Sequence, residues 1–284
     1  MKINEIKNGN INKIYLLEVD NNKYIIRISN FDNSFECKVL ELLKKYEYNC
    51  PKIITSFELN GKYIMIYRYL EGNNPNEFND KFFISLAQLL RKLHSINCDF
   101  SGDEYILNEE SQSKLCEYYN KAIKSKYLLN ELDLINKIYN EVLNLELDGF
   151  KKCIIHSDVK RENTLQNQDE LFLIDFGNCY IGSRLIDIVR VIMWFFIKNQ
   201  NYDYRQIQLF INSYFDDNNL TPVEKNGVDK LFVYCVLYNL LKDISLNEDG
   251  VLTAEYIENN SLSWLESLKN KEKILKIGGM VKNA

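Results

Sequence analysis

The feature that most constrains this chain is the segment "HSDVKRENTLQNQDELFLIDFGN", residues 156–178. Asp158 follows one apolar run, Asn163 comes five residues later, and Asp175 ends a second apolar run, "LFLID". If the segment contains a β-hairpin, the hairpin brings Asn163 and Asp175 to one end, and Gly177 allows a sharp turn beyond them. These polar residues predict either a phosphate-transfer centre or ordinary turns between strands.

Phosphoryl transfer makes simple demands that these residue types meet. It needs a metal ion and a cation on the phosphates, and a carboxylate that orients the attacking hydroxyl. Mg²⁺ binds oxygen ligands and keeps several of its waters. One carboxylate and one amide oxygen are therefore a normal number of protein ligands for it. Asn163 and Asp175 would bind Mg²⁺, and Asp158 would orient the hydroxyl.

Composition bounds the class of protein. The chain has 284 residues, of which 46% are apolar and 26% are charged, with a formal net charge of -5. It is long enough for one large or two unequal domains. No basic stripe with interleaved aromatic residues occurs, so we expect no nucleic-acid partner.

The sequence also indicates where the protein works. Its seven cysteines are odd in number and widely spaced, which argues against a disulfide framework or a zinc site. The polar start, "MKINEIKNGN", does not resemble a signal peptide. The most apolar run, residues 188–197, is too short to span a bilayer and carries Arg190. We therefore expect no membrane association and a reducing, cytoplasmic location.

Periodicity predicts two lobes of different kinds. The first seventy residues read as β-strands at 11–20, 22–29, 51–58 and 62–70, with one helix at 32–48. The linker "EGNNPNE", residues 71–77, contains glycine and proline and reads as a hinge. Helices then dominate, at 80–96, 125–147, 185–198, 204–216, 223–244 and 261–275. We predict an α+β fold with a β-rich lobe, 1–70, and a larger helical lobe, 71–284, with a ligand cleft between them.

The segment with which we began resembles a known signature. His156, Asp158 and Asn163, followed by Asp-Phe-Gly at 175–177, resemble the H-x-D-x-x-x-x-N and D-F-G motifs of the protein-kinase-like fold. Within that fold the chain resembles the aminoglycoside phosphotransferase and choline kinase superfamily, from about residue 6 to residue 200. The resemblance implies a bilobal kinase-like fold that binds ATP and Mg²⁺.

The resemblance also assigns roles in the first lobe. "NGNINKIYLLE" is similar to the hairpin that covers the phosphates, with Gly9 and Asn12 in place but without a full GxGxxG. "YIIRIS" matches the strand that presents a phosphate-binding cation, here Arg27. "ECKVLELL" matches the helix whose glutamate orients that cation, which implies Glu36, with Glu41 as the alternative.

Further roles follow from the same resemblance. The backbone from Tyr67 to Tyr69 would hold the adenine, and Lys160 would neutralise the transferred phosphoryl group. His156 and Asp187 would brace the catalytic loop rather than react.

The acceptor would lie in the helical lobe. Its candidate lining is Trp194, Tyr234, Tyr238 and Asp243. Aromatic faces with carboxylates suit a quaternary ammonium or an aminoglycoside, although aromatic residues at helical spacing are more often part of a core.

Three functions remain to be weighed. A protein Ser/Thr kinase would carry a long activation segment ending in A-P-E, but no A-P-E occurs and an apolar helix pattern already begins at Arg184. A catalytically silent nucleotide-binding module would not need the full set of metal and base residues. The resemblance therefore implies an ATP-dependent phosphotransferase. It would act on a hydroxyl of a small molecule, such as an aminoglycoside, choline, ethanolamine, or a related amino alcohol or sugar.

Overall fold

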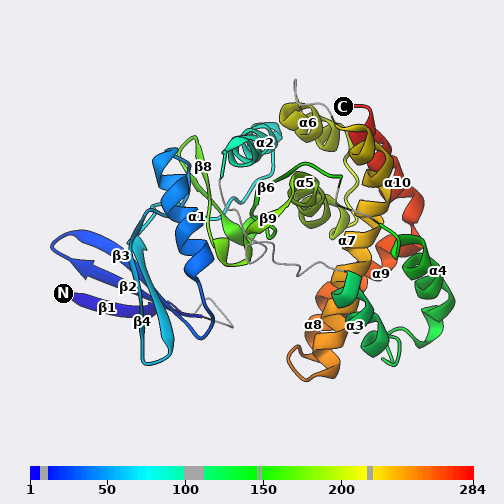
Figure 1. Cartoon of the computed structure of the whole chain (residues 1–284), viewed down its shortest axis with the longest axis horizontal. Helices are drawn as coiled ribbons and strands as arrows, with labels where there is room; N and C mark the ends of the chain where they lie inside the picture. The colour runs from blue at the N-terminus through cyan, green and yellow to red at the C-terminus, as the bar shows by residue number, and fades with distance from the viewer. Residues whose placement is uncertain (7–11, 99–111, 146, 148, 216–219) are drawn as a thin grey trace.

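The chain folds into a small strand-rich lobe and a larger helical lobe that lie side by side (Figure 1). The computed structural model describes residues 1–6, 12–98, 112–145, 147, 149–215 and 220–284. The predicted α+β fold with two unequal lobes is confirmed.

The small lobe is built on a five-stranded antiparallel sheet with the order β1-β2-β3-β5-β4. The strands are β1 Lys2–Ile6, β2 Lys13–Val19, β3 Asn22–Ser29, β4 Ile53–Leu59 and β5 Lys62–Arg68. Asn60 and Gly61, with φ of 52° and 70°, form the tight turn between β4 and β5, as their sequence predicts. The predicted strand pairs are confirmed, whereas β1 was not predicted because "KINEI" is almost wholly exposed.

Helix α1, Ser34–Lys45, lies on the side of the sheet that faces the helical lobe (Figure 1). Val39, Leu40 and Leu43 are fully buried on its inner face. The strand register places Arg27 of β3 between Ile14 of β2 and Met65 of β5, at the centre of the sheet. The first turn of α1 therefore lies close to the only arginine of β3.

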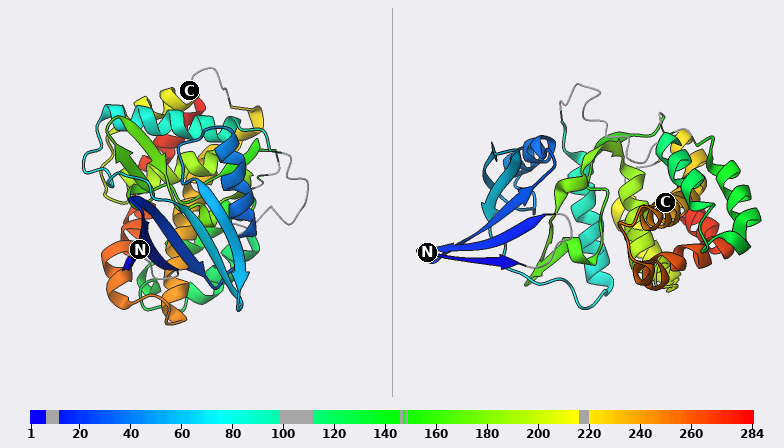
Figure 2. Two further views of the ribbon diagram at one scale, coloured as in Figure 1. Left: turned by 90° about the vertical axis from the view of Figure 1, so that its left-hand side faces the viewer. Right: turned by 90° about the horizontal axis from the view of Figure 1, so that it is seen from below.

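Helices make up most of the larger lobe (Figure 2). They are α2 Asp80–Ser95, α3 Gln112–Ala122, α4 Leu132–Val142, α5 Arg184–Ile192, α6 Tyr204–Phe215, α7 Pro222–Glu248, α8 Ala254–Tyr256, α9 Leu262–Lys269 and α10 Lys271–Lys282. Helix α7 packs against α3, α4, α5, α9 and α10 and forms the axis of the lobe. Two single π-helical turns, η5 at Met193–Ile197 and η6 at Ile257–Ser261, follow α5 and α8.

Two short strand pairs join the helices to the cleft. Strand β6, Lys152–Ile155, pairs with β9, Tyr180–Ser183, and β7, Thr164–Asn167, pairs with β8, Glu170–Leu173. The predicted β7–β8 hairpin is confirmed. Strand β9 was not predicted, because four residues with a central glycine carry little strand signal.

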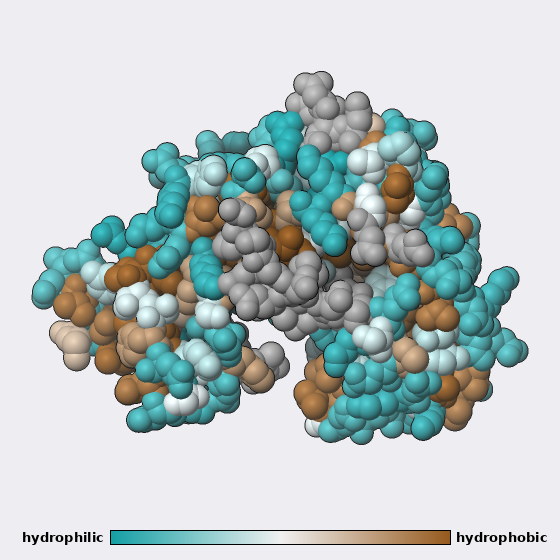
Figure 3. All heavy atoms as spheres, in the orientation of Figure 1, coloured by the Kyte–Doolittle hydropathy of each residue, from teal (hydrophilic) through white to brown (hydrophobic). Residues whose placement is uncertain are grey.

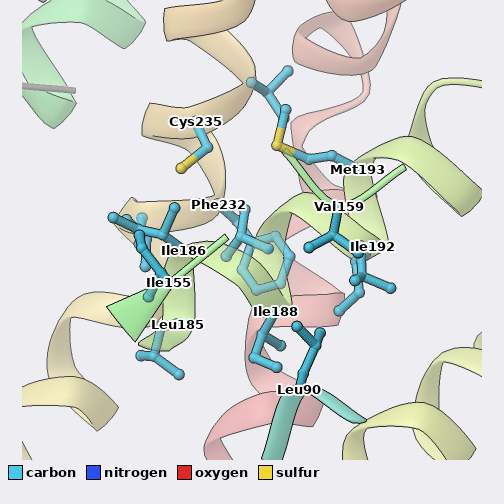
Figure 4. Packing of buried hydrophobic residues seen from close by; sticks show 14 of the residues in the cluster. Leu90, Ile155, Val159, Leu185, Ile186, Ile188, Ile192, Met193, Phe232 and Cys235 are labelled. Atoms are coloured by element: carbon cyan, nitrogen blue, oxygen red, sulfur yellow. The ribbon is translucent and has the colours of Figure 1, made fainter. Parts of the chain in front are cut away.

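The core of the large lobe surrounds α5 and explains the most apolar run of the sequence. All nine residues of α5 are buried, and they pack with Val159 and Phe232 from β6–β7 and α7 (Figure 4). The run 188–197 thus belongs to a buried core helix, as predicted, but its last five residues form a π-turn, which was not predicted. Among the helices that the structure describes, none is long and apolar enough to cross a membrane.

One predicted helix is partly wrong. The stretch predicted as a helix at 125–147 begins with turns and a short 3-10 helix, Leu129–Glu131, and α4 starts only at Leu132. The apolar stripe is nevertheless buried at Leu128, Ile135, Tyr139 and Val142, and Leu132 is partly buried. The turns before Leu132 are closed by hydrogen bonds between residues three apart, such as Leu128 N–H to the Ser125 carbonyl at 3.1 Å. Helix α3 was not predicted, because its sequence is largely polar.

Hydrogen bonds at two places connect the lobes through the β7–β8 hairpin. The Leu173 N–H donates to the Asn49 carbonyl at 3.0 Å, just before β4. Asn73, in the linker after β5, exchanges two backbone hydrogen bonds with Gln166 at 3.1 and 2.8 Å. Gly72 adopts φ of 150°, and a Cβ there would lie 3.0 Å from the Gln166 carbonyl. The division into 1–70 and 71–284 stays a prediction.

A buried ion pair fixes the start of two helices in the large lobe. Arg184 opens α5, and its guanidinium contacts the Glu224 carboxylate at 2.9 and 3.1 Å. Glu224 also accepts the backbone N–H groups of Lys151 and Thr221. Burial raises the pKa of Glu224, but the hydrogen bonds from Arg184 and Thr221 outweigh it and hold the pKa below its ordinary value.

We predict that Glu224→Ala destabilises the fold by about 3–5 kcal/mol, because it leaves Arg184 buried without its partner. Urea unfolding at neutral pH measures the loss, and Glu266→Ala, at an exposed position of α9, is the control. The pKa of Glu224 is lowered on folding, so its contribution is present above the ordinary pKa of about 4.3 and is lost as the pH falls. A difference that does not shrink at low pH would contradict the ionised pair.

Candidate active site

Asp158 follows β6 by three residues, and its side-chain contacts within the protein are made by Oδ2. Asn163 Nδ2 donates to Asp158 Oδ2 at 2.9 Å and to the Asp158 carbonyl at 2.8 Å, and Lys160 Nζ lies 2.7 Å from the same Oδ2. The neighbouring Val159 is fully buried and anchors the loop in the core. Within the described part of the chain, no hydrogen bond reaches Asp158 Oδ1, which leaves this oxygen available to accept a hydroxyl proton.

A second carboxylate fixes the backbone before Asp158. Asp187, in α5, accepts the N–H groups of His156 and Ser157 at 2.8 and 2.7 Å, and its Oδ2 lies 3.0 Å from His94 Nε2. Ser157 has φ of 62°, an uncommon conformation for a residue with a side chain. Burial raises the pKa of Asp187, but the hydrogen bond from His94 and the backbone outweigh it, so the net pKa is lowered. Asp187 thus acts as a brace.

His156 also serves the loop structurally. Its Nδ1 accepts the Asp158 N–H at 3.3 Å, and its Nε2 lies 2.9 Å from the Ile174 carbonyl, which requires a proton on Nε2. The ring meets Phe176 edge-on, with centroids 4.6 Å apart. Both nitrogens are therefore occupied within the protein, and His156 has no free position for proton transfer.

The β7–β8 hairpin brings Asp175 to the same end as Asn163. The Ile174 N–H donates to the Asn163 carbonyl at 3.0 Å, so the residues before β7 and after β8 are adjacent. Asp175 adopts φ of 62° and ψ of 69°, and its side chain is 52% exposed. Aspartate tolerates this left-handed conformation better than most residues. The carboxylate therefore faces the opening rather than the core.

Arg27 and Glu36 form a buried ion pair that reaches this carboxylate. Arg27 Nη2 contacts Glu36 Oε2, and its Nη1 lies 3.4 Å from Asp175 Oδ1. Burial would lower the pKa of Arg27, but the Glu36 carboxylate outweighs it and holds the pKa above its ordinary value. Glu41, the alternative partner, is exposed on the outer face of α1. The geometry therefore selects Glu36.

The arrangement offers oxygen ligands of the kind that Mg²⁺ uses. Both hydrogen bonds that Asn163 donates come from Nδ2, which leaves Oδ1 as a ligand, and Asp175 supplies a carboxylate. A Cβ at Gly177 would lie 3.3 Å from Asp175 Oδ1, so glycine keeps this region open. Among the described residues, no cluster of three or more His, Cys, Asp or Glu could hold a metal. A shared site with waters and phosphates fits these donors.

The residues predicted to bind the nucleotide lie along the same opening. Tyr67 is in β5, and burial raises the pKa of its hydroxyl, which interacts electrostatically with Arg27. The Tyr69 N–H is already bonded to the Lys23 carbonyl at 3.1 Å. Within the described chain, the Leu70 N–H makes no hydrogen bond, so the first backbone donor available to an adenine lies one residue beyond the predicted range.

Asn12 directly precedes β2, which runs beside β3 with Ile14 opposite Arg27. It therefore lies at the same end of the sheet as the predicted phosphate cation, and its Oδ1 is buried without a partner among the described residues. Gly9, named with it in the sequence, falls outside the described residues.

The predicted acceptor residues divide into two groups. Trp194, in η5, lies beside the catalytic loop, with Lys160 Nζ 5.5 Å from its ring centre, and Asp243 accepts a hydrogen bond from Ser261 at 2.7 Å. Tyr234 and Tyr238 are each only 2% exposed. Helix α7 is buried on all faces from residue 231 to 238, so both tyrosines pack in the core and do not line a surface.

The surface is hollowed between the strand-rich lobe and the lower helices (Figure 3). Helix α8 and the adjoining end of α7 border this notch on the helical side (Figure 1).

One residue that supports the loop around Asn163 was not predicted. Asn74, in the linker, donates from Nδ2 to the carbonyls of Thr164, Glu162 and Arg161 at 2.8, 3.1 and 3.2 Å. These carbonyls flank Asn163 on both sides. The asparagine-rich linker "EGNNPNE" was the available signal, but its partners are distant in the sequence.

A buried cation on a strand, a glutamate on the following helix, and an Asp-Asn-Asp set on two loops define a kinase-like phosphotransfer site. The model of the phosphotransferase enzyme family (APH) matches residues 2–217. The chain belongs to this family. No curated protein sequence matches the chain significantly.

Solved structures show the same fold at low sequence identity. A spectinomycin phosphotransferase, in complex with ADP and spectinomycin, has a TM-score of 0.70 and 15% identity, over 99% of this chain and 93% of that chain. An ethanolamine kinase from Plasmodium vivax has a TM-score of 0.69 and 16% identity, over 95% and 84%. An amicoumacin kinase in complex with AMP-PNP, Ca²⁺ and its ligand has a TM-score of 0.69 and 13% identity, over 96% of this chain and 89% of that chain.

We predict that Asp187→Asn destabilises the protein by about 3 kcal/mol, because an amide cannot accept both backbone N–H groups and also pair with His94. Thermal or urea unfolding measures the loss. Asp169→Asn, at an exposed position, should change stability by less than about 0.5 kcal/mol. An Asp187→Asn protein as stable as the wild type would show that the brace is dispensable.

Proposed function

We propose that this protein transfers the γ-phosphate of ATP to a hydroxyl group of a small molecule. One observation carries the proposal: ion pairs and hydrogen bonds connect residues of both lobes in one series. Glu36 contacts Arg27, and Arg27 contacts Asp175. A backbone hydrogen bond from the residue before Asp175 to the Asn163 carbonyl places Asp175 beside Asn163, which donates to Asp158. The series contains each group that phosphoryl transfer needs.

Each residue then has a distinct role. Arg27, oriented by Glu36, binds the α- and β-phosphates with a charge that does not titrate near neutral pH. Asp158 Oδ1 accepts a hydrogen bond from the acceptor hydroxyl and aligns it for in-line attack. Lys160, held at Asp158, lies where it can neutralise charge on the transferred group. Positioning and charge stabilisation supply most of the rate enhancement.

Asn163 Oδ1 and the Asp175 carboxylate would hold Mg²⁺. When bound, Mg²⁺ neutralises charge on the phosphate oxygens and fixes their orientation. The backbone beyond β5, including the unused Leu70 N–H, would hold the adenine. The ADP and AMP-PNP in structures of the same fold support the use of a nucleotide.

The short segment between Asp175 and helix α5 supports a small acceptor. From Asp175 it passes through the 3-10 turn Phe176–Asn178 and strand β9 directly into α5 at Arg184. All residues in this interval are described, and they contain no long segment on which a peptide could dock. We place the reaction in the cytoplasm, where ATP is available, and note that none of the seven cysteines, all of them described, forms a disulfide.

The proposal is tested with radiolabelled ATP and a panel of hydroxylated acceptors that includes aminoglycosides, choline, ethanolamine, sugars and hydroxy acids. We expect label on at least one small acceptor. Asp158→Asn should lower turnover by about 100-fold or more, because the hydroxyl loses its orienting carboxylate, while Mg·ATP affinity changes little. Label found only on peptides, or undiminished transfer by Asp158→Asn, would refute the proposal.

We predict that Asp175→Ala abolishes the Mg²⁺-dependent part of ATP binding, because the metal loses its only carboxylate. Isothermal titration calorimetry with ATP, in Mg²⁺ and in EDTA, measures that part. Asp203→Ala, a helix-capping aspartate at the start of α6, is the control. Equal Mg²⁺ dependence in the wild type and Asp175→Ala would rule out Asp175 as a ligand.

A further inference from the structure

The indole face that was expected to receive a cationic acceptor already carries protein cations. Lys198 Nζ lies 4.6 Å from the centre of the Trp194 ring, and Lys160 Nζ lies 5.5 Å from it. Cation–π contacts of this kind place ammonium groups on the ring. A quaternary ammonium would have to displace at least one lysine from Trp194.

The two lysines differ in how they are neutralised. Lys160 pairs with Asp158 at 2.7 Å. Lys198 is partly buried, and no carboxylate of the described chain lies within ion-pair distance of it. Its hydrogen bond goes to Asn260 Oδ1 at 3.3 Å, a neutral acceptor. Partial burial lowers the pKa of Lys198, and a cation that is poorly solvated and unpaired is ready to bind an anion.

Lys198 stands where two irregular turns meet. It directly follows η5, and Asn260 belongs to η6. Trp194 of η5 also meets Trp264 edge-on, with ring centroids 5.4 Å apart. Single π-turns are rare and are frequently found at functional sites. Two of them facing each other beside the catalytic loop indicate a built binding surface.

The charged groups around Lys198 allow it to bind an anion. Glu162 and Asp243 both act on it electrostatically, but Glu162 is exposed. Asp243 accepts a hydrogen bond from Ser261, and burial raises its pKa. Arg190 and Lys242 also act on Asp243. Both carboxylates thus act on Lys198 from a distance, and within the described chain neither forms an ion pair with it.

We propose that the acceptor carries an anionic group, a carboxylate or a phosphate monoester, which binds Lys198 between Trp194 and Asn260. The proposal rests on the proposed function, because it concerns the acceptor of that reaction. Lys198 and Lys160 both lie over the Trp194 ring, and Lys160 contacts Asp158. An anion at Lys198 therefore places the rest of a short acceptor beside the carboxylate that orients its hydroxyl. The Asn260 amide can donate to the same anion.

The first test uses the two tryptophans as a local probe. Trp194 and Trp264 are the only tryptophans of the chain, and both lie at this site. Their fluorescence is followed during titration with 4-hydroxybutyrate, glycerol 3-phosphate, 4-amino-1-butanol and choline, at constant ionic strength, with and without Mg²⁺ and a non-hydrolysable ATP analogue. We expect a saturable change with an anion, and the two anions distinguish a carboxylate from a phosphate site.

Three variants show whether Lys198 is responsible. Lys198→Met should weaken binding of the anion about tenfold or more, and Lys198→Arg should keep most of it. The control is Lys276 of α10, whose Nζ lies 3.8 Å from the centre of the Tyr204 ring. The Lys276→Met variant should bind the anion like the wild type. Circular dichroism confirms that each variant is folded.

The outcomes separate this inference from the proposed function. A response to choline or 4-amino-1-butanol alone, no response to either anion, or wild-type binding by Lys198→Met would overturn the anionic acceptor. Phosphate transfer from ATP to a cationic or neutral acceptor would then leave the proposed function standing. Failure of the wild type to bind Mg·ATP in calorimetry would instead overturn the proposed function.

Discussion

The buried Asp187 carboxylate is the interaction on which the geometry of the site depends. It accepts two successive backbone N–H groups and thereby holds Ser157 in a left-handed conformation. A conformation of this kind persists only where the surroundings over-determine it. Because Asp187 lies in α5, which is buried along its whole length, the position of Asp158 is set by the packing of the large lobe and not by the loop alone.

The small lobe is joined to that rigid base by charge. The Arg27 guanidinium is buried between sheet and helix, and it faces Glu36 on one side and Asp175 on the other. A buried cation needs such partners, because removal from water costs several kcal/mol without them. The contact to Asp175 is the weaker one, since that carboxylate is half exposed. The arginine can therefore exchange it for a phosphate while Glu36 keeps it oriented.

The sequence predicted the parts of the site whose residues lie close together along the chain. Asn163 and Asp175 flank one hairpin and Asp158 lies in the loop just before it, and Arg27 and Glu36 lie on consecutive elements, so spacing alone brings them together. Contacts between distant segments were not predictable. Asn74 bonds to Thr164 and Lys198 bonds to Asn260, across 90 and 62 residues of sequence. The aromatic spacing on α7 was misleading because a helix buried on every face gives its aromatic residues no surface to line.

The two hydrogen-bonded junctions at Asn49 and Asn73 restrict how the lobes can move. Both attach the β7–β8 hairpin to the edge of the sheet that holds β4 and β5. A rigid rotation that preserves both must turn about the line through them. Strands β1 and β2, at the opposite edge of the sheet, then travel furthest, and β4 hardly moves. The small lobe can thus swing about its β4–β5 edge, with β1 and β2 as the free edge.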